Sequence, residues 1–143
     1  MELKIRLARN KHELNQVLRI REIVFIKGQN VPKDLEMDGL DGKSKHAIVF
    51  YKNKPIGCAR IRLFDRKAKL ERIAILKEYR GKRVGGRLVQ YLIDYCKRRK
   101  VEEVILHSQC YIKKFYEQYG FKSRGEIFID AGIRHIGMYL RLS

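Results

Sequence analysis

The segment that decides the fold reads LERIAILKEYRGKRVGGRLVQYLID, residues 70–94. Its apolar start predicts a strand, and apolar residues at helical spacing, Leu88, Leu92 and Tyr95, predict a helix after the basic loop 80–86. Glycines in such a loop let backbone N–H groups point at an anion beside the positive end of the helix. The segment therefore predicts a phosphate-binding strand, loop and helix, with a plain glycine-rich turn as the alternative.

The spacing within this loop excludes two common nucleotide sites. No Gly-Lys-Ser/Thr follows the glycines, so the loop is not a Walker loop, and the G-x-G-x-x-G spacing of a Rossmann turn is missing. Nucleotide hydrolysis and NAD chemistry are thus not expected.

The remaining elements are predicted on both sides of this segment. Alternation predicts strands, and Asn10 with Glu13 resembles a capping box that starts a helix. The expected strands are 3–7, 46–51, 56–63, 69–76 and 101–106 and the two that flank a turn at 130–133, and a short helix is expected at 112–119. The order β-α-β-β-β-α-β-α-β-β predicts a mixed α/β sandwich.

Length and composition indicate one soluble domain over residues 1–143 with enough apolar material, 45%, for a core. The three cysteines form no C-x-x-C pair, so neither a disulfide framework nor a metal site is expected. No apolar run approaches the roughly 18 residues of a membrane span, and no signal peptide is recognisable. These features predict a cytoplasmic protein that does not enter membranes.

The chain carries a formal net charge of +17. Such an excess favours polyanionic partners: nucleic acid, anionic lipid or a phosphorylated cofactor. Because the basic residues are spread along the chain, a solvated basic face explains them equally well.

Two motifs resemble the GNAT superfamily of acyl-CoA-dependent N-acyltransferases. Arg80 to Gly86, RGKRVGG, is similar to the Q/R-x-x-G-x-G/A signature, and Phe115 to Phe121, FYEQYGF, is similar to the F-Y-x-x-x-G-F segment. Segments 24–32, 36–41 and 132–138 are further similar to the small ElaA-like branch. The resemblance implies an α/β (α+β) fold with a largely antiparallel central sheet of about seven strands flanked by helices.

The resemblance also implies an acetyl-CoA site. Backbone groups of Ile73, Ala74 and Ile75 would pair with the pantetheine arm, although an ordinary core strand gives the same pattern. The pyrophosphate would lie on Arg80, Gly81, Lys82, Arg83, Val84, Gly85 and Gly86. The sequence departs from the family pattern at Arg83, where the signature usually has its middle glycine. It also departs at Gln109, where many members carry asparagine and where the resemblance implies a contact with the cofactor or with a proton path.

Transfer of an acetyl group to an amine requires the amine to be neutral. For a lysine-like amine of pKa about 10.4, neutralisation at pH 7 costs roughly 4.6 kcal/mol, which a base, a water path or a desolvating pocket must offset. The resemblance assigns Tyr116 as the acid that protonates the leaving thiolate. Packing beside Phe115 and Phe121 is the alternative for Tyr116.

Acidic residues are concentrated in residues 34–41. If this segment is extended, Asp34, Glu36 and Asp38 share one side, and with Asp41 they could bind a cationic amine. A solvated loop that relieves the repulsion among basic residues is the alternative. Glu71, on the strand that leads to the loop, is a candidate base, although a strand glutamate can also be half of a surface ion pair.

The histidines and cysteines offer fewer candidates. His135 lies in the ElaA-like segment and is a candidate proton shuttle, with His46 a weaker one, whereas His107 is interpreted as packed or solvated. Cys110 has no evident His/Asp pair and is interpreted as a small buried residue.

The expected function is acetyl-CoA-dependent N-acetyl transfer to a small-molecule or peptide amine, by a monomer or homodimer. A non-catalytic CoA-binding or nucleic-acid-binding module is the alternative.

Overall fold

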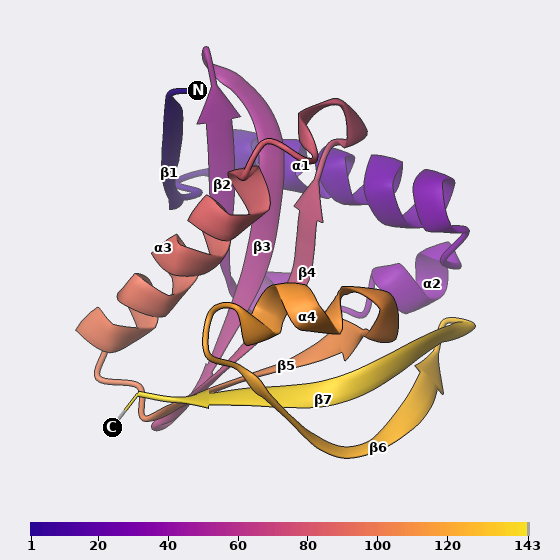
Figure 1. Ribbon diagram of the computed structural model, residues 1–143. Coiled ribbons are helices and arrows are strands. Elements are labelled where there is room, and N and C mark those ends of the chain that lie inside the picture. Colours follow the sequence, from indigo (N-terminus) through magenta and orange to yellow (C-terminus); the bar gives the residue numbers. More distant parts are fainter. Residues whose placement is uncertain (143) are drawn as a thin grey trace.

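The computed structural model describes residues 1–142, which form one seven-stranded sheet with helices on both faces (Figure 1). The strands are β1 Leu3–Leu7, β2 Lys45–Tyr51, β3 Lys54–Phe64, β4 Lys67–Ile75, β5 Glu103–Gln109, β6 Lys122–Asp130 and β7 Ile133–Arg141. The helices are α1 Lys11–Arg21, α2 Lys33–Glu36, α3 Val84–Arg98 and α4 Lys113–Glu117. A π-helical turn, Glu22–Lys27, extends α1.

The strand order in the sheet is β1-β2-β3-β4-β5-β7-β6, and every neighbouring pair is antiparallel except β4 with β5. The sheet thus confirms the expected mixed, largely antiparallel architecture of about seven strands. The expected element order is also found, with the short helix α2 as an addition.

The parallel strands β4 and β5 pair only along part of their length. Their register runs from Lys67 beside Glu103 to Leu70 beside Leu106, and no further pair follows. Just beyond this point Arg72 adopts a left-handed conformation with φ 54°, and the β3–β4 register shifts there. A bulge of this kind bends a strand and ends its pairing. The two strands consequently separate and leave a gap in the middle of the sheet.

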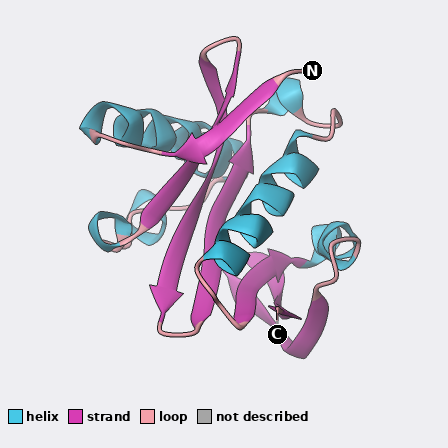
Figure 2. Ribbon diagram, turned by 90° about the vertical axis from the view of Figure 1, so that its left-hand side faces the viewer, coloured by secondary structure: helices cyan, strands magenta, loops and turns pink. Residues whose placement is uncertain are grey.

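The two faces of the sheet carry different helices. Figure 2 shows α1 and α2 on one side of the sheet and α3 and α4 on the other. The α3 face buries Ile61, Leu70 and Leu106, whereas the α1 face buries the arginines Arg21 and Arg60. The α3 side of the sheet is thus packed with apolar residues, whereas the α1 side also buries charged side chains.

The local signals for the helices are partly confirmed. The Asn10 side chain accepts a hydrogen bond of 2.9 Å from the backbone N–H of Glu13, as the capping pattern predicts. The extended conformation considered for the acidic segment is not found in its first part, because Lys33–Glu36 forms α2 immediately after Pro32. Pro32 is the N-cap residue of α2, and its carbonyl accepts hydrogen bonds of 3.0 and 3.1 Å from the N–H groups of Leu35 and Glu36.

Candidate active site

A cleft of about 1250 Å³ opens where β4 and β5 separate. Its walls come from both strands, the glycine-rich loop, the start of α3, α4, the α1–α2 region and the β6–β7 turn. It therefore brings together residues from nearly the whole length of the chain.

The glycine-rich loop ends at the start of α3. Gly81 and Arg83 both have left-handed backbones, with φ 76° and 65°, and no side chain caps the first turn of α3. The backbone N–H groups of residues 84–86 therefore have neither helical nor side-chain partners. Together with the helix dipole, they form a site suited to a phosphate.

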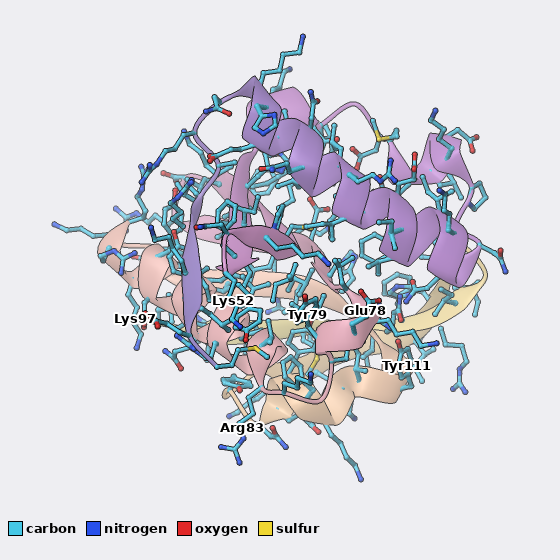
Figure 3. The ribbon with its side chains drawn as sticks, turned by 90° about the horizontal axis from the view of Figure 1, so that it is seen from above. Lys52, Glu78, Tyr79, Arg83, Lys97 and Tyr111 are labelled. Atoms are coloured by element: carbon cyan, nitrogen blue, oxygen red, sulfur yellow. The ribbon has the colours of Figure 1, made fainter. Side chains whose placement is uncertain are left out.

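Arg83 takes the left-handed conformation that a glycine adopts at no steric cost. Its exposed side chain lies on the loop before α3 (Figure 3). The departure from the signature therefore leaves the turn intact but adds a basic group beside the uncapped start of α3. Val84 is buried in the core, so only its backbone can contribute, and Lys82 is exposed on the loop without lining the cleft.

Arg80 and Gly86 have specific contacts. The Nε of Arg80 donates a 2.9 Å hydrogen bond to the carbonyl of Ile75, which fixes the loop against the end of β4. A Cβ on Gly86 would lie 2.0 Å from the hydroxyl of Tyr119. Gly86 is thus required for the close approach of Tyr119 to the start of α3.

Gly85 faces the cleft and has more room. A Cβ there would meet only the Phe115 ring, at 3.5 Å, which is an ordinary contact. We expect Gly85→Val to weaken acetyl-CoA binding about tenfold or more, because the branched side chain would stand where phosphate must approach the backbone. Titration calorimetry measures the affinity, and Gly42→Val, at a glycine outside the cleft with no neighbouring atom within 4 Å, is the control. A folded Gly85→Val variant with unchanged affinity would remove the phosphate role of this loop.

The end of β4 forms one wall of the gap. Ala74 and Ile75 pair with β3 through Cys58 and Gly57, while the opposite edge of Ile73–Ile75 faces the space that β5 has left. This edge is available to an extended ligand. Gln109 stands across the gap and donates a 3.0 Å hydrogen bond from its amide to the Gln29 side chain.

Tyr116 lies in α4 and lines the cleft, with 5% of its surface exposed. Its ring packs edge to face against Phe115 and Phe121, at centroid distances of 5.0 and 6.0 Å. Burial, with a smaller contribution from Tyr111, raises the pKa of Tyr116 above its usual value. The packing and the cleft position occur together, so the two interpretations of Tyr116 do not exclude each other. Its hydroxyl stays protonated near neutral pH and can donate a proton.

Three acids of the 34–41 segment, Glu36, Asp38 and Asp41, are paired with arginines, whereas Asp34 is exposed. Glu36, with 2% of its surface exposed, accepts two 3.0 Å hydrogen bonds from Arg21. Asp38 accepts hydrogen bonds of 2.8 and 2.7 Å from Arg60, which together with the nearby charges lower the pKa of Asp38. The Nε of Arg72 also lies 3.0 Å from a Glu36 oxygen, although it makes no hydrogen bond there.

Asp41 completes this cluster by linking its two buried arginines. It accepts hydrogen bonds of 2.6 Å from Arg21 and 3.1 Å from Arg60. Of Glu36, Asp38 and Asp41, only Glu36 lines the cleft. Their assignment to substrate binding therefore lacks the unpaired negative charge on which it was based.

The carboxylate of Glu71 is also paired with basic side chains. One of its oxygens accepts from Arg60 and Arg62 and the other from Arg62, and Lys69 lies 3.4 Å away. Burial disfavours the charged carboxylate, but the hydrogen bonds from Arg62 and the charge of Arg60 outweigh it and lower the pKa of Glu71. Glu71 lines the cleft, as a role as the base requires. Its lowered pKa, however, makes it a weak base.

His135 lies in the cleft wall, and its Nδ1 is 2.8 Å from the carbonyl of Ile133. Because a carbonyl only accepts, Nδ1 carries the proton, and the lone pair of a neutral ring is on Nε2. His46 instead is buried outside the cleft with its Nε2 on the Asp41 carbonyl.

The burial of Arg21 and Arg60 was not predicted from the sequence. Arg21 falls on the apolar stripe of α1 beside Val17, Ile20 and Val24, where an unpaired charge would be costly. That position is the available signal, since a charged residue on a buried stripe requires a partner. Nothing in the local sequence, however, points to Glu36 or Asp41 as that partner.

Within residues 1–142 no group of three or more histidine, cysteine or acidic side chains could hold a metal ion. No helix in the same range is long and apolar enough to cross a membrane. Cys58 and Cys96 are buried, Cys110 is partly exposed, and all three are free thiols.

Comparison with known proteins agrees with this geometry. Residues 15–142 match the acetyltransferase (GNAT) domain family. The uncharacterized N-acetyltransferase YjcF of Bacillus subtilis is 37% identical, over 95% of this chain and 98% of its own. ElaA of Escherichia coli is 29% identical over 88% of this chain and 86% of its own. The crystal structure of ElaA superposes with a TM-score of 0.87 at 26% identity, covering 98% and 99% of the two chains.

A crystal structure of a Bacillus subtilis acetyltransferase in complex with CoA shares the fold, with a TM-score of 0.76 at 14% identity over 99% of this chain and 100% of that one. The family match covers most of the chain, and the similarity to ElaA confirms the resemblance carried by the RGKRVGG and FYEQYGF motifs. The chain is therefore an acetyltransferase enzyme that belongs to the GNAT family.

Proposed function

We propose that this enzyme transfers the acetyl group of acetyl-CoA directly to an amine while both substrates are bound. The observation that carries the proposal is the single cleft that joins the glycine-rich loop to a polar chamber beside His135 and Glu71. Two substrates can enter such a cleft from opposite sides and meet where β4 and β5 separate. The GNAT family of this chain supports acetyl transfer as the reaction.

The residues of the loop fit the phosphates of CoA. The uncapped start of α3 supplies backbone donors, Gly85 leaves room for close approach, and Arg80, Arg83 and Arg87 place positive charge around the site. The free edge of β4 at Ile73–Ile75 is suited to hydrogen bonds with the amide groups of the pantetheine arm. The acetyl group would then lie in the gap between the strands, within reach of Tyr116.

The reaction forms one bond and breaks one. The amine nitrogen attacks the thioester carbonyl carbon, the C–S bond breaks, and the sulfur leaves as a thiolate that takes a proton from the Tyr116 hydroxyl. An amine that is protonated at pH 7 gives up one proton to the protein or to water before it attacks, and its nitrogen gives up a second proton as the amide forms. The tyrosine proton is restored from solvent before the next turnover, so protons balance over the cycle.

A covalent acetyl-enzyme is not part of the proposal. Among the cleft-lining residues in the range 1–142 there is no cysteine, and Ser108 uses its hydroxyl in a 2.8 Å hydrogen bond to the Gln109 carbonyl. An acyl-enzyme route needs a nucleophile held next to a base. The cleft instead supports direct attack.

The acceptor class is an amine, on a small molecule or a peptide. A preference for cationic amines remains a prediction, but Glu36, Asp38 and Asp41 no longer support it, since arginines neutralise their charges.

Initial-velocity kinetics tests the order of events. With acetyl-CoA and a primary amine varied together, direct attack predicts double-reciprocal lines that intersect, and the acetylated amine should appear only when both are present. Parallel lines with an isolable acetyl-protein would contradict the proposal.

A further inference from the structure

We propose that His107 is the base that removes the proton from the attacking amine. The inference rests on the proposed function and names the group that this function leaves open. His107 lies on β5, directly after Leu106, which is the last β5 residue that pairs with β4. His107 therefore stands at the point where the gap in the sheet opens, and it lines the cleft.

The register of the sheet decides which face His107 occupies. Lys69 pairs with Ile105, and since side chains alternate along a strand, Glu71 and His107 lie on the same face two residues further on. His135 pairs with Gln109 and shares this face. It is the face covered by α1 and α2, opposite to the one that carries α4 and Tyr116 (Figures 1 and 2). A base at His107 and an acid at Tyr116 would thus act from opposite sides of the gap.

The ring of His107 is held in place but chemically free. It packs edge to face on Phe128 at a centroid distance of 5.1 Å, and Phe128 stacks in turn on His135 at 5.8 Å. The described hydrogen bonds include none to either ring nitrogen of His107, whereas Nδ1 of His135 donates to the carbonyl of Ile133. The side chain is exposed to the cleft, so a substrate can reach it.

Burial and the charges around His107 keep its ring unprotonated, so that the ring can accept a proton. Lys69 and Glu71 lie near it on β4, His135 on β7 and Asp130 at the end of β6, while Arg124 and Glu126 line a second hollow that His107 also lines. Burial and the Lys69 charge lower the pKa of His107 and outweigh Glu71 and Asp130. His107 is consequently neutral at pH 7.

The neighbouring carboxylate is a poorer candidate for the same task. Arg60, Arg62 and Lys69 occupy Glu71, so taking a proton there would weaken several charged contacts. Protonation of His107 breaks no contact, and it places positive charge near Glu71. The arginine-held Glu71 acts instead as a fixed negative group that stabilises the protonated histidine.

A pair of amine probes tests the role of His107. Phenethylamine is protonated at pH 7, whereas hydroxylamine is largely neutral and does not depend on a base. We expect His107→Gln to lower kcat/KM for phenethylamine by about 10²–10⁴-fold and for hydroxylamine by less than about tenfold. The affinity for acetyl-CoA should stay within about twofold, and His12→Gln, on the exposed side of α1, is the matched control.

The pH dependence distinguishes a base from a structural residue. The wild-type kcat/KM should fall on the acid side with a midpoint below about 6.5, and this fall should be absent from His107→Gln and present in His135→Gln. Equal losses for both amines, or an acid limb that disappears with His135 instead, would overturn the assignment.

An NMR titration of the His107 ring provides a readout that needs no acceptor. A midpoint below about 6.5 supports the role, and a midpoint above 7 overturns it, because the ring would then already carry the proton. A wild-type protein that fails to bind acetyl-CoA would overturn the proposed function itself, whereas normal acetyl-CoA binding with an unaffected His107→Gln variant would overturn only this inference.

Discussion

Replacing Tyr116 with phenylalanine is expected to lower kcat by about 10²–10⁴-fold, the usual contribution of a general acid. The change removes one hydroxyl and keeps the ring between Phe115 and Phe121, so the aromatic packing of α4 should survive. The affinity for acetyl-CoA should change little, because the hydroxyl is needed when the thiolate leaves and not when the thioester binds. Stopped-flow measurement of CoA release in the first turnover checks the chemical step directly.

A second buried tyrosine provides the matched control. Tyr95 in α3 has 5% of its surface exposed, its hydroxyl has no hydrogen-bond partner, and it does not line the cleft. Tyr95→Phe should therefore leave kcat unchanged and should not destabilise the fold. If Tyr116→Phe retains the wild-type rate of the chemical step, Tyr116 has a packing role and the leaving thiolate takes its proton elsewhere.

The second large effect is on stability. We expect Arg60→Met to lower the free energy of unfolding by about 3–5 kcal/mol, because breaking a buried ion pair leaves charge without compensation. The Arg60 side chain is fully buried and is paired with Asp38, Asp41 and Glu71. Its removal would take one positive charge away from three partly buried carboxylates at once. Urea unfolding at pH 7 measures the difference.

The pH dependence of this difference identifies its electrostatic origin. In the wild type the pKa values of Asp38, Asp41 and Glu71 are lowered, so these groups stabilise the fold above their unfolded pKa and lose that contribution as the pH falls. In Arg60→Met each of these carboxyl groups loses one basic partner while keeping others, such as Arg21 for Asp41 and Arg62 for Glu71. Protonation of the carboxyl groups then removes part of the uncompensated negative charge in the variant. The gap between wild type and variant should therefore narrow from pH 7 to pH 4.

The control for Arg60 is an arginine in an exposed pair. Arg66 lies 3.0 Å from Glu102, with side-chain exposures of 72% and 49%. Arg66→Met should change stability by less than about 1 kcal/mol, as expected for a surface ion pair. Equal effects of the two substitutions, or a gap that does not vary with pH, would show that Arg60 contributes packing and not charge compensation.

The order of the elements was predictable because local patterns encode it. The capping pair Asn10 and Glu13, the alternating strands and the turn at 130–133 depend on neighbours in the sequence, and the structure confirms them. The family resemblance added the expectation of one largely antiparallel sheet of about seven strands, which periodicity alone does not contain. Arg83 illustrates the limit of a motif, since the left-handed turn forms there without the expected glycine.

The polar side of the site was not predictable in the same way. Asp38 and Glu71 pair with Arg60 across 22 and 11 residues, and Arg21 reaches Glu36 and Asp41 across 15 and 20. The sequence presents the acids as a free negative cluster, because their partners become neighbours only when β3, β4 and α1 assemble. The surroundings of His107 could not be predicted for the same reason, since its neighbours Lys69, Phe128 and His135 come from three other strands.

The central claim is that the cleft between β4 and β5 binds acetyl-CoA, and a thermal shift with that ligand tests it most directly. A ligand that binds only the folded state adds about 2.7 kcal/mol of stability at a hundredfold excess over its Kd. We predict a clear rise in Tm with acetyl-CoA that Gly85→Val largely removes and Gly42→Val retains. An unchanged Tm at millimolar acetyl-CoA would contradict the claim.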